Sequence, residues 1–259
     1  MILDEIAAKT RVRVAELKQV RPLAEVKAQA AALDPNTGFQ FEKALRTDDV
    51  AFICEVKKAS PSKGIIAEDF PYLEIAKDYE AAGASAISVL TEPYYFKGSD
   101  KYLTEIANAV SIPVLRKDFT VDAYQIYEAK IIGASAVLLI CALLDTDTLT
   151  EYLEIAHSLG LSAIVEAHTE EEVQSAIRSG ARIIGVNNRN LKTFEVDITT
   201  GARLRRLVPE STIFVSESGI KTAADIAVLR ENKTNAVLIG ETFMRSPDKK
   251  KMLAELRGI

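Results

Sequence analysis

The sequence contains few residues of the types that commonly bind metals. Its 259 residues include two cysteines, Cys54 and Cys141, and two histidines, His157 and His168. Both cysteines lie in apolar runs without a Cys or His at metal-ligand spacing, so we expect buried thiols and no metal site. His157 falls in a helical segment and His168 follows a strand without an obvious partner. We expect incidental roles for both, His168 being the one that could support a neighbouring site residue.

Long apolar runs and an excess of positive charge are also absent. No uninterrupted apolar segment approaches the roughly 18 residues of a membrane-spanning helix, and the start Met-Ile-Leu-Asp-Glu lacks the pattern of a signal peptide. The formal net charge is 32 minus 37, or −5, which provides no global positive field for nucleic acid or an anionic membrane. We therefore expect a cytoplasmic protein that binds neither, and any anionic ligand must be held locally.

The composition is that of an ordinary globular protein. Apolar residues make up 48% of the chain and charged residues 27%, which is enough apolar surface for a sizeable core. The length fits one large domain or two small ones, and single α/β barrels commonly fall near it.

From residue 51 onward, short apolar runs alternate with longer segments of helical periodicity, as in repeated βα units. We expect helices within segments such as 72–82, 123–132, 147–159 and 169–179. The eight expected strands are 51–56, 84–90, 112–116, 135–141, 161–166, 182–187, 212–216 and 235–240. Eight units favour a closed (β/α)8 TIM barrel, although right-handed crossovers also suit an open doubly wound sheet.

An N-terminal helical extension, residues 1–49, precedes the predicted barrel of residues 50–259. Apolar residues recur on one side of a helix near its start, turn residues interrupt it at 33–38, and residues 39–45 form a short segment leading to the first strand. The extension is either a packing element that covers the barrel or a substrate lid.

Polar side chains end several of the predicted strands. Because alternate residues of a strand share a face, Glu55 and Lys57 project to the same side, and Lys117, Glu166 and Asn187 continue the inward faces of later strands. Each residue viewed alone is also compatible with a structural ion pair or a solvent-facing strand end. Barrel enzymes build their sites at the carboxyl ends of the strands, and carboxylates beside ammonium groups suit proton transfer.

Two turns with small residues, 216–220 and 239–242, follow the last two strands. Glycine lets the backbone approach an anion, and barrels often bind phosphate at this position. Simple loop geometry is the alternative explanation.

Four segments resemble indole-3-glycerol phosphate synthase: residues 55–64 (EVKKASPSKG), 113–119 (PVLRKDF), 185–191 (GVNNRNL) and 216–220 (SESGI). The resemblance covers about residues 50–245 in the family's order and is looser over the extension. It implies a TIM barrel that closes, decarboxylates and dehydrates an anthranilate-linked 1-deoxyribulose 5-phosphate without metal or redox cofactor. The loop at residues 91–98 and Ala167 depart from the family pattern without removing a proposed acid, base or phosphate contact.

The resemblance also implies roles for individual residues. Lys117 is the general acid for ring closure, and Lys57 contacts the substrate carboxylate. Glu55 and Glu166 transfer protons in an order that the sequence leaves open, and Asn187 positions a substrate hydroxyl or a catalytic carboxylate. The further site residues are Ser218 in the catalytic set and phosphate cradle, Gly219, Ile239 and Gly240 in the phosphate turns, Glu217 and Arg189 in the polar lining, Ser60 and Pro61 in the first loop, and Phe96, Phe119, Leu138 and Leu191 as apolar walls.

Other functions remain compatible with these motifs. Phosphoribosylanthranilate isomerase has the same fold and needs a phosphate site with an acid/base pair, a Schiff-base aldolase would use Lys57 or Lys117 as nucleophile, and a binding barrel would hold a phosphate ligand without turnover. Since the chain spans one barrel, we expect a monofunctional enzyme, a monomer, with a small phosphorylated molecule as substrate.

Overall fold

The computed structural model describes residues 2–190 and 193–258, and its centre is a closed barrel of eight parallel strands. The barrel strands are β1 Ala51–Val56, β4 Ala86–Leu90, β5 Val114–Lys117, β6 Ala136–Ile140, β7 Ser162–Ala167, β8 Ile183–Asn187, β9 Ile213–Glu217 and β10 Ala236–Ile239. Neighbours in sequence pair in parallel, and β1 closes the ring by pairing with both β4 and β10. The predicted (β/α)8 barrel is confirmed, and the alternative prediction of an open doubly wound sheet is wrong.

The first strand has the predicted bounds, and the ends of the other strands differ from prediction by at most two residues; the differences in the third and seventh strands matter for the site. The third barrel strand begins at Val114 rather than 112, since Pro113 has no N–H to donate to the ladder. It also continues through Lys117, and β9 continues through Glu217. Both side chains are therefore fixed by strand backbone rather than carried on a loop.

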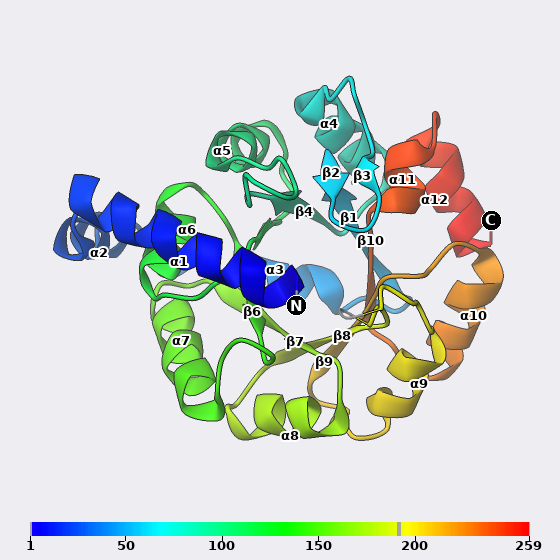
Figure 1. Ribbon diagram of the computed structural model, residues 1–259. Helices are drawn as coiled ribbons and strands as arrows, with labels where there is room; N and C mark the ends of the chain where they lie inside the picture. The colour runs from blue at the N-terminus through cyan, green and yellow to red at the C-terminus, as the bar shows by residue number, and fades with distance from the viewer. Residues whose placement is uncertain (1, 191–192, 259) are drawn as a thin grey trace.

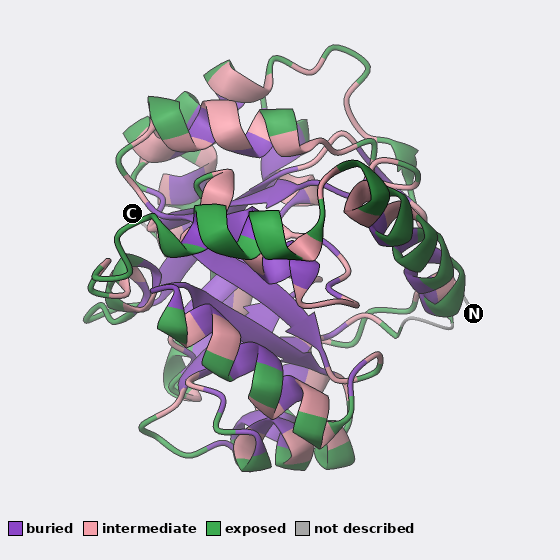
Figure 2. Cartoon of the chain, turned by 90° about the vertical axis from the view of Figure 1, so that its left-hand side faces the viewer, coloured by how far each residue is buried: buried purple, intermediate pink, exposed green. Residues whose placement is uncertain are grey.

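Helices surround the barrel and present their exposed faces outward, as Figure 2 shows. They are α4 Tyr72–Ala82, α5 Asp100–Ala109, α6 Tyr124–Ile131, α7 Thr146–Ser158, α8 Glu170–Arg178, α9 Thr199–Arg205, α10 Ala223–Glu231, α11 Glu241–Arg245 and α12 Lys249–Arg257. The four predicted helices match within two residues at each end. Their ends follow local chemistry: Gly83 ends α4 at φ 93°, and Thr222 begins α10 in a capping box with Asp225.

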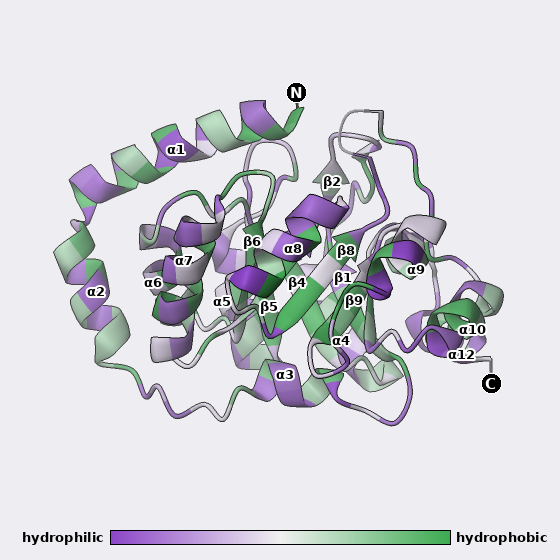
Figure 3. Ribbon diagram, turned by 90° about the horizontal axis from the view of Figure 1, so that it is seen from below, coloured by the Kyte–Doolittle hydropathy of each residue, from purple (hydrophilic) through white to green (hydrophobic). Residues whose placement is uncertain are grey.

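Three helices form the N-terminal extension: α1 Ile2–Val20, α2 Leu23–Ala31 and α3 Gln40–Leu45. Figure 1 shows α1 crossing one end of the barrel, and Figure 3 shows α3 on the opposite side. Phe41 and Leu45 of α3 are fully buried against the apolar side chains of the barrel interior. The interior is therefore filled at the α3 end, and the end beneath α1 holds the polar side chains. Within residues 2–190 and 193–258, none of the helices has the length and apolar character needed to cross a membrane.

Ion pairs attach α1 to the segment after β5. Arg13 donates two hydrogen bonds to Asp118, at 2.9 and 2.8 Å, and Lys18 lies 2.6 Å from Asp122. Val14 packs in a small apolar cluster with Val26 of α2 and a tyrosine of α6. The first helix is thus held against the strand that carries Lys117.

Candidate active site

A cavity of about 820 Å³ opens at the carboxyl ends of the barrel strands. This volume is within the roughly 300–1,000 Å³ of small-molecule sites. The described residues that the sequence indicated for catalysis or binding all line it: Glu55, Lys57, Ser60, Pro61, Phe96, Lys117, Phe119, Leu138, Glu166, Asn187, Arg189, Glu217, Ser218, Gly219, Ile239 and Gly240. Leu191, expected in the apolar wall, lies outside the described residues.

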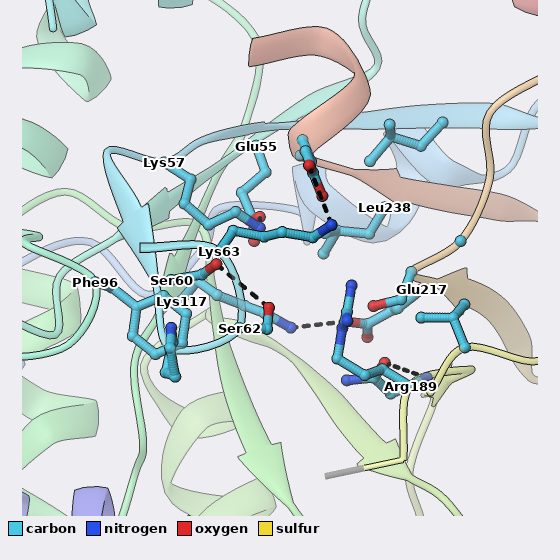
Figure 4. Close-up of a pocket in the computed structure, with 18 of the residues that line it drawn as sticks. Glu55, Lys57, Ser60, Ser62, Lys63, Phe96, Lys117, Arg189, Glu217 and Leu238 are labelled. Carbon is cyan, nitrogen blue, oxygen red and sulfur yellow. Dashed lines mark hydrogen bonds and ion pairs between the residues drawn. The ribbon is translucent and has the colours of Figure 1, made fainter. Parts of the chain in front are cut away.

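The centre of the cavity is an ammonium group between two carboxylates. Lys117 Nζ lies 2.7 Å from Oε2 of Glu217 (Figure 4). The same nitrogen lies 3.1 Å from Oε2 of Glu166. The three side chains come from β5, β9 and β7, so the closed sheet brings together residues far apart in sequence. Asn187, at the end of β8, donates a longer hydrogen bond of 3.4 Å to the other oxygen of Glu166.

Mutual charge sets the protonation of this cluster. Burial disfavours the charged form of Lys117, but Glu217 and Glu166 outweigh it and raise the pKa of the ammonium above its usual value. Burial also favours neutral Glu166, yet Lys117 and His168 lower the pKa of that carboxyl below its usual range. For Glu217, burial together with nearby Glu166 prevails over Lys117 and raises the pKa to about 7. The same cation thus faces one ionised carboxylate and one that titrates near neutrality.

A second ion pair lies at the end of β1. The ammonium of Lys57 donates to Oε2 of Glu55, and the strand places both side chains on the inner face as alternation predicts. Gly240 lies directly behind this pair: a Cβ there would be 2.3 Å from the same Glu55 oxygen and 2.7 Å from Lys57 Nζ. A side chain at this position would therefore displace the Glu55–Lys57 pair.

The turn after β9 has an unusual backbone. Ser218 and Gly219 both have positive φ, 67° and 86°, and Asn188 donates to the carbonyl of Ser218 at 3.0 Å. A Cβ on Gly219 would be 2.4 Å from Val196. The left-handed backbone and the close loop together explain the glycine.

Sequence reasoning missed several residues that line the cavity. Three cations, Lys63, Lys221 and Arg245, surround the glycine turns, and Lys63 lies 3.6 Å from Glu241. Lys63 was within a recognised motif but received no role. On the apolar side, Leu3 and Ile6 of α1 join the lining. No local pattern in α1 distinguishes residues that face a ligand from residues that face a core.

Two expectations about minor residues need correction. His168 was expected to have no obvious partner, but its ring lies 3.0 Å from Glu172 and 3.3 Å from Glu166. Cys54 is buried as expected. Cys141 is only partly buried because it follows β6 at the mouth of the barrel, and its sulfur lies 3.5 Å from the carbonyl of Glu172.

Among the described residues, no group of three or more His, Cys, Asp or Glu side chains could hold a metal ion.

The fold and the site together define the class of protein: a (β/α)8-barrel enzyme with buried acids and bases at the carboxyl ends of its strands. The chain belongs to the indole-3-glycerol phosphate synthase family, whose model, described as "Indole-3-glycerol phosphate synthase", matches residues 3–256. The resemblance seen in the motifs is confirmed, and it extends over the helical extension.

Two relatives of that name match along their whole length. The indole-3-glycerol phosphate synthase of Ruminiclostridium cellulolyticum is 65% identical over 258 residues, which cover 100% of this chain and 99% of the relative. That of Endomicrobium trichonymphae is 57% identical over 257 residues, covering 99% and 100%. Among solved structures, 3-hexulose-6-phosphate synthase has a TM-score of 0.63 at 16% identity, covering 81% of this chain and 99% of that one, a likeness of fold alone.

Proposed function

We propose that this chain converts 1-(2-carboxyphenylamino)-1-deoxyribulose 5-phosphate into indole-3-glycerol phosphate, carbon dioxide and water. As a member of its family it is a carboxy-lyase of tryptophan biosynthesis. The observation that carries the assignment of residues is the buried ammonium of Lys117 between Glu166 and Glu217. Incubating the purified chain with this substrate and measuring indole-3-glycerol phosphate and carbon dioxide tests the activity. If neither compound formed, the proposed function would be wrong.

Lys117 acts as the acid in ring closure. The aromatic carbon that bears the carboxylate attacks the ketone, and the ammonium donates a proton to the developing alkoxide. Two carboxylates keep this ammonium charged, which suits a proton donor. A Schiff-base lysine needs the opposite, a lowered pKa and a neutral amine, so this environment favours acid catalysis over the aldolase alternative.

Lys57 and Glu55 act at the other side of the cavity. Lys57 binds the substrate carboxylate until it leaves as carbon dioxide, and Glu55, paired with it, orients the ammonium and accepts a proton during dehydration. Glu166 transfers the proton at the departing hydroxyl, while Asn187 holds that carboxyl by the hydrogen bond to Oε1. Phe96 and Phe119, with ring centroids 6.0 Å apart, form the wall against the anthranilate ring.

The phosphate is bound by the two glycine turns. Ser218, Gly219 and Gly240 provide backbone approach, and the nearby cations Lys63 and Arg245 complement its charge.

The phosphate turn yields a prediction about Gly219→Val. The new side chain would meet Val196 at a positive φ, so the turn must shift, and we expect the affinity for a ketone-reduced substrate analogue to fall by about tenfold or more. Gly180→Val is the matched control, because Gly180 has a similar φ of 83° with open space around it. Calorimetric titration of both variants should show the loss only at position 219, and equal affinities would contradict the cradle.

Metal chelation yields a second prediction. Since the proposed chemistry uses side-chain acids and bases, activity should be unchanged after dialysis against EDTA. Turnover is compared before and after, and loss of activity that one specific metal restores would contradict the proposed chemistry.

We further propose that the enzyme acts in the cytoplasm as a monomer. The described residues that line the cavity run from Ile2 to Arg245, so one barrel and its N-terminal extension supply side chains to every part of the proposed site. Light scattering at the concentration of the activity assay measures the molecular mass, and a dimer mass would contradict this.

A further inference from the structure

His168 lies between two carboxylates just past the end of β7. Its Nδ1 is 3.0 Å from Oε2 of Glu172, which also accepts the backbone N–H of His168 at 2.6 Å. Its Nε2 is buried, makes no hydrogen bond within the described part of the chain, and lies 3.3 Å from Oε1 of Glu166. Glu172 therefore fixes one side of the ring, and the other side is directed at a carboxyl of the site.

This arrangement determines where protons reside. With Nδ1–H donated to Glu172, Nε2 faces Glu166 either as an N–H donor to a carboxylate or as an acceptor from a carboxylic acid. The 3.3 Å contact is therefore short enough to be the path by which one proton passes between the two groups. Other titratable groups around the pair are Lys117 from β5, Glu217 from β9, Glu55 from β1 and Cys141 after β6.

The charged form of the ring is the stable one. Burial opposes the imidazolium, but Glu166 and Glu172 outweigh it and raise the pKa of His168 to about 10. A raised pKa means that the ring contributes stability below its ordinary value of about 6.5 and loses that contribution as the pH rises through about 10. At neutral pH the pair therefore rests as imidazolium and carboxylate.

The proposed reaction needs a proton at this place. The substrate carboxylate leaves as neutral carbon dioxide, so each turnover takes up one proton in total, and the departing hydroxyl must be protonated within the cavity. The side chains of Glu166, His168 and Glu172 are 5%, 14% and 22% exposed, respectively. Exposure increases outward along this row, so solvent reaches its far end first.

We infer that His168 is a positioning residue that stores the proton donated by Glu166 and receives its replacement from solvent. The proton moves from Nε2 to Oε1 of Glu166, which passes it to the leaving hydroxyl. The imidazole, still held through Nδ1–H by Glu172, then takes a proton from water. This inference rests on the proposed role of Glu166 and adds the source of its proton.

Two variants distinguish storage of a proton by His168 from the hydrogen bonds and packing of its ring. His168→Gln places an amide N–H near Glu166 but cannot store a proton, and Glu172→Gln keeps a hydrogen-bond acceptor while removing the charge that stabilises the imidazolium. We expect kcat to fall by about tenfold or more with little change in KM, and the alkaline limb of kcat to move down by about one pH unit or more. His157→Gln is the matched control. His157 lies in α7, packs against the ring of Phe39 and does not line the cavity.

Nuclear magnetic resonance provides a readout independent of turnover. The chain has only two histidines, so their ring nitrogens can be assigned by comparing each variant with the parent. We expect His168 to remain an imidazolium well above pH 7, and His157, whose pKa burial and Arg182 lower to about 4, to be neutral there. In Glu172→Gln the titration of His168 should move to lower pH.

The outcomes are distinct. An ordinary titration of His168 near pH 6.5, or a His168→Gln variant whose alkaline limb is unchanged, overturns the inference. A uniform loss of kcat at all pH values with a matching loss of folding stability assigns His168 a structural role and also overturns it. If the parent enzyme formed no product, the proposed function would fail, while the ring titration would still report on the protonation of His168.

Discussion

Lys117→Met should leave a folded barrel that has lost most of its turnover. The methionine preserves much of the aliphatic stem but has no proton to donate, and general acid catalysis contributes about 100- to 10,000-fold. We expect the single-turnover rate constant for product formation to fall by that factor. The affinity for the ketone-reduced analogue should stay nearly unchanged. Circular dichroism checks the fold, and rapid quenching measures the chemistry.

The structure adds an effect of pH on this variant. Without the ammonium, no positive charge lies between Glu166 and Glu217 to offset the repulsion of their two negative charges. The pKa of each carboxyl should therefore rise. A carboxyl whose pKa is raised by folding contributes stability at low pH and loses it as the pH rises through the folded value. The variant should therefore be less stable relative to the parent at pH 8 than at pH 5.

Lys101→Met is the matched control for losing a lysine. Its side chain is 70% exposed on α5 and lies 3.7 Å from Glu105, so neither activity nor stability should change measurably. If Lys117→Met instead formed product at nearly the parental rate while folded, Lys117 would not be the principal acid, and Lys57 or Glu166 would take its place.

The polar strand ends show how much of the site was predictable. Alternation along β1 placed Glu55 and Lys57 on one face, and the structure pairs them. The contact between Lys117 and Glu217 could not be read from the chain, because it joins residues 100 apart across the barrel mouth. Which inward-facing ends meet depends on the register and tilt of the closed sheet, and these are properties of the whole ring.

His168 was a different kind of omission, because a local signal was present. Glu172 follows it by four residues at the start of α8, where Thr169 caps the helix and Glu172 lies in the first turn. A histidine just before an N-cap, with a glutamate at this spacing, can form a hydrogen bond to that glutamate, so this contact was predictable from the local sequence. The partner on the other side, Glu166, is also only two residues away, although its direction depends on how the strand ends.

The docking of the first helix depends on contacts that no local pattern shows. Arg13 lies 105 residues before Asp118, and one guanidinium nitrogen of Arg13 donates to both carboxylate oxygens of Asp118. The two side chains are 15% and 1% exposed, respectively. Asp118 follows Lys117 directly and also accepts from Thr91 at 2.8 Å. The pair therefore connects α1, which covers the cavity, with the strand end that carries the proposed acid.

Arg13→Met should destabilise the enzyme by about 2 to 3 kcal/mol. A buried carboxylate that loses a partner is costly, and Thr91 and Arg116, the latter 3.8 Å away, compensate only in part. Because α1 loosens over the cavity, the amides of residues 2–20 should exchange hydrogen faster and kcat/KM should fall by about tenfold, equivalent to roughly 1.4 kcal/mol. Urea denaturation, hydrogen exchange and steady-state kinetics measure the three effects.

Lys18→Met provides the control on the same helix. Lys18 and Asp122 are each 33% exposed, so breaking this pair should cost about 1 kcal/mol or less and leave kcat/KM unchanged. The contrast is informative because both pairs join α1 to the segment after β5, and only one is buried beside Lys117. Equal stability losses in the two variants, or normal protection and kinetics in Arg13→Met, would show that apolar packing alone holds α1 over the site.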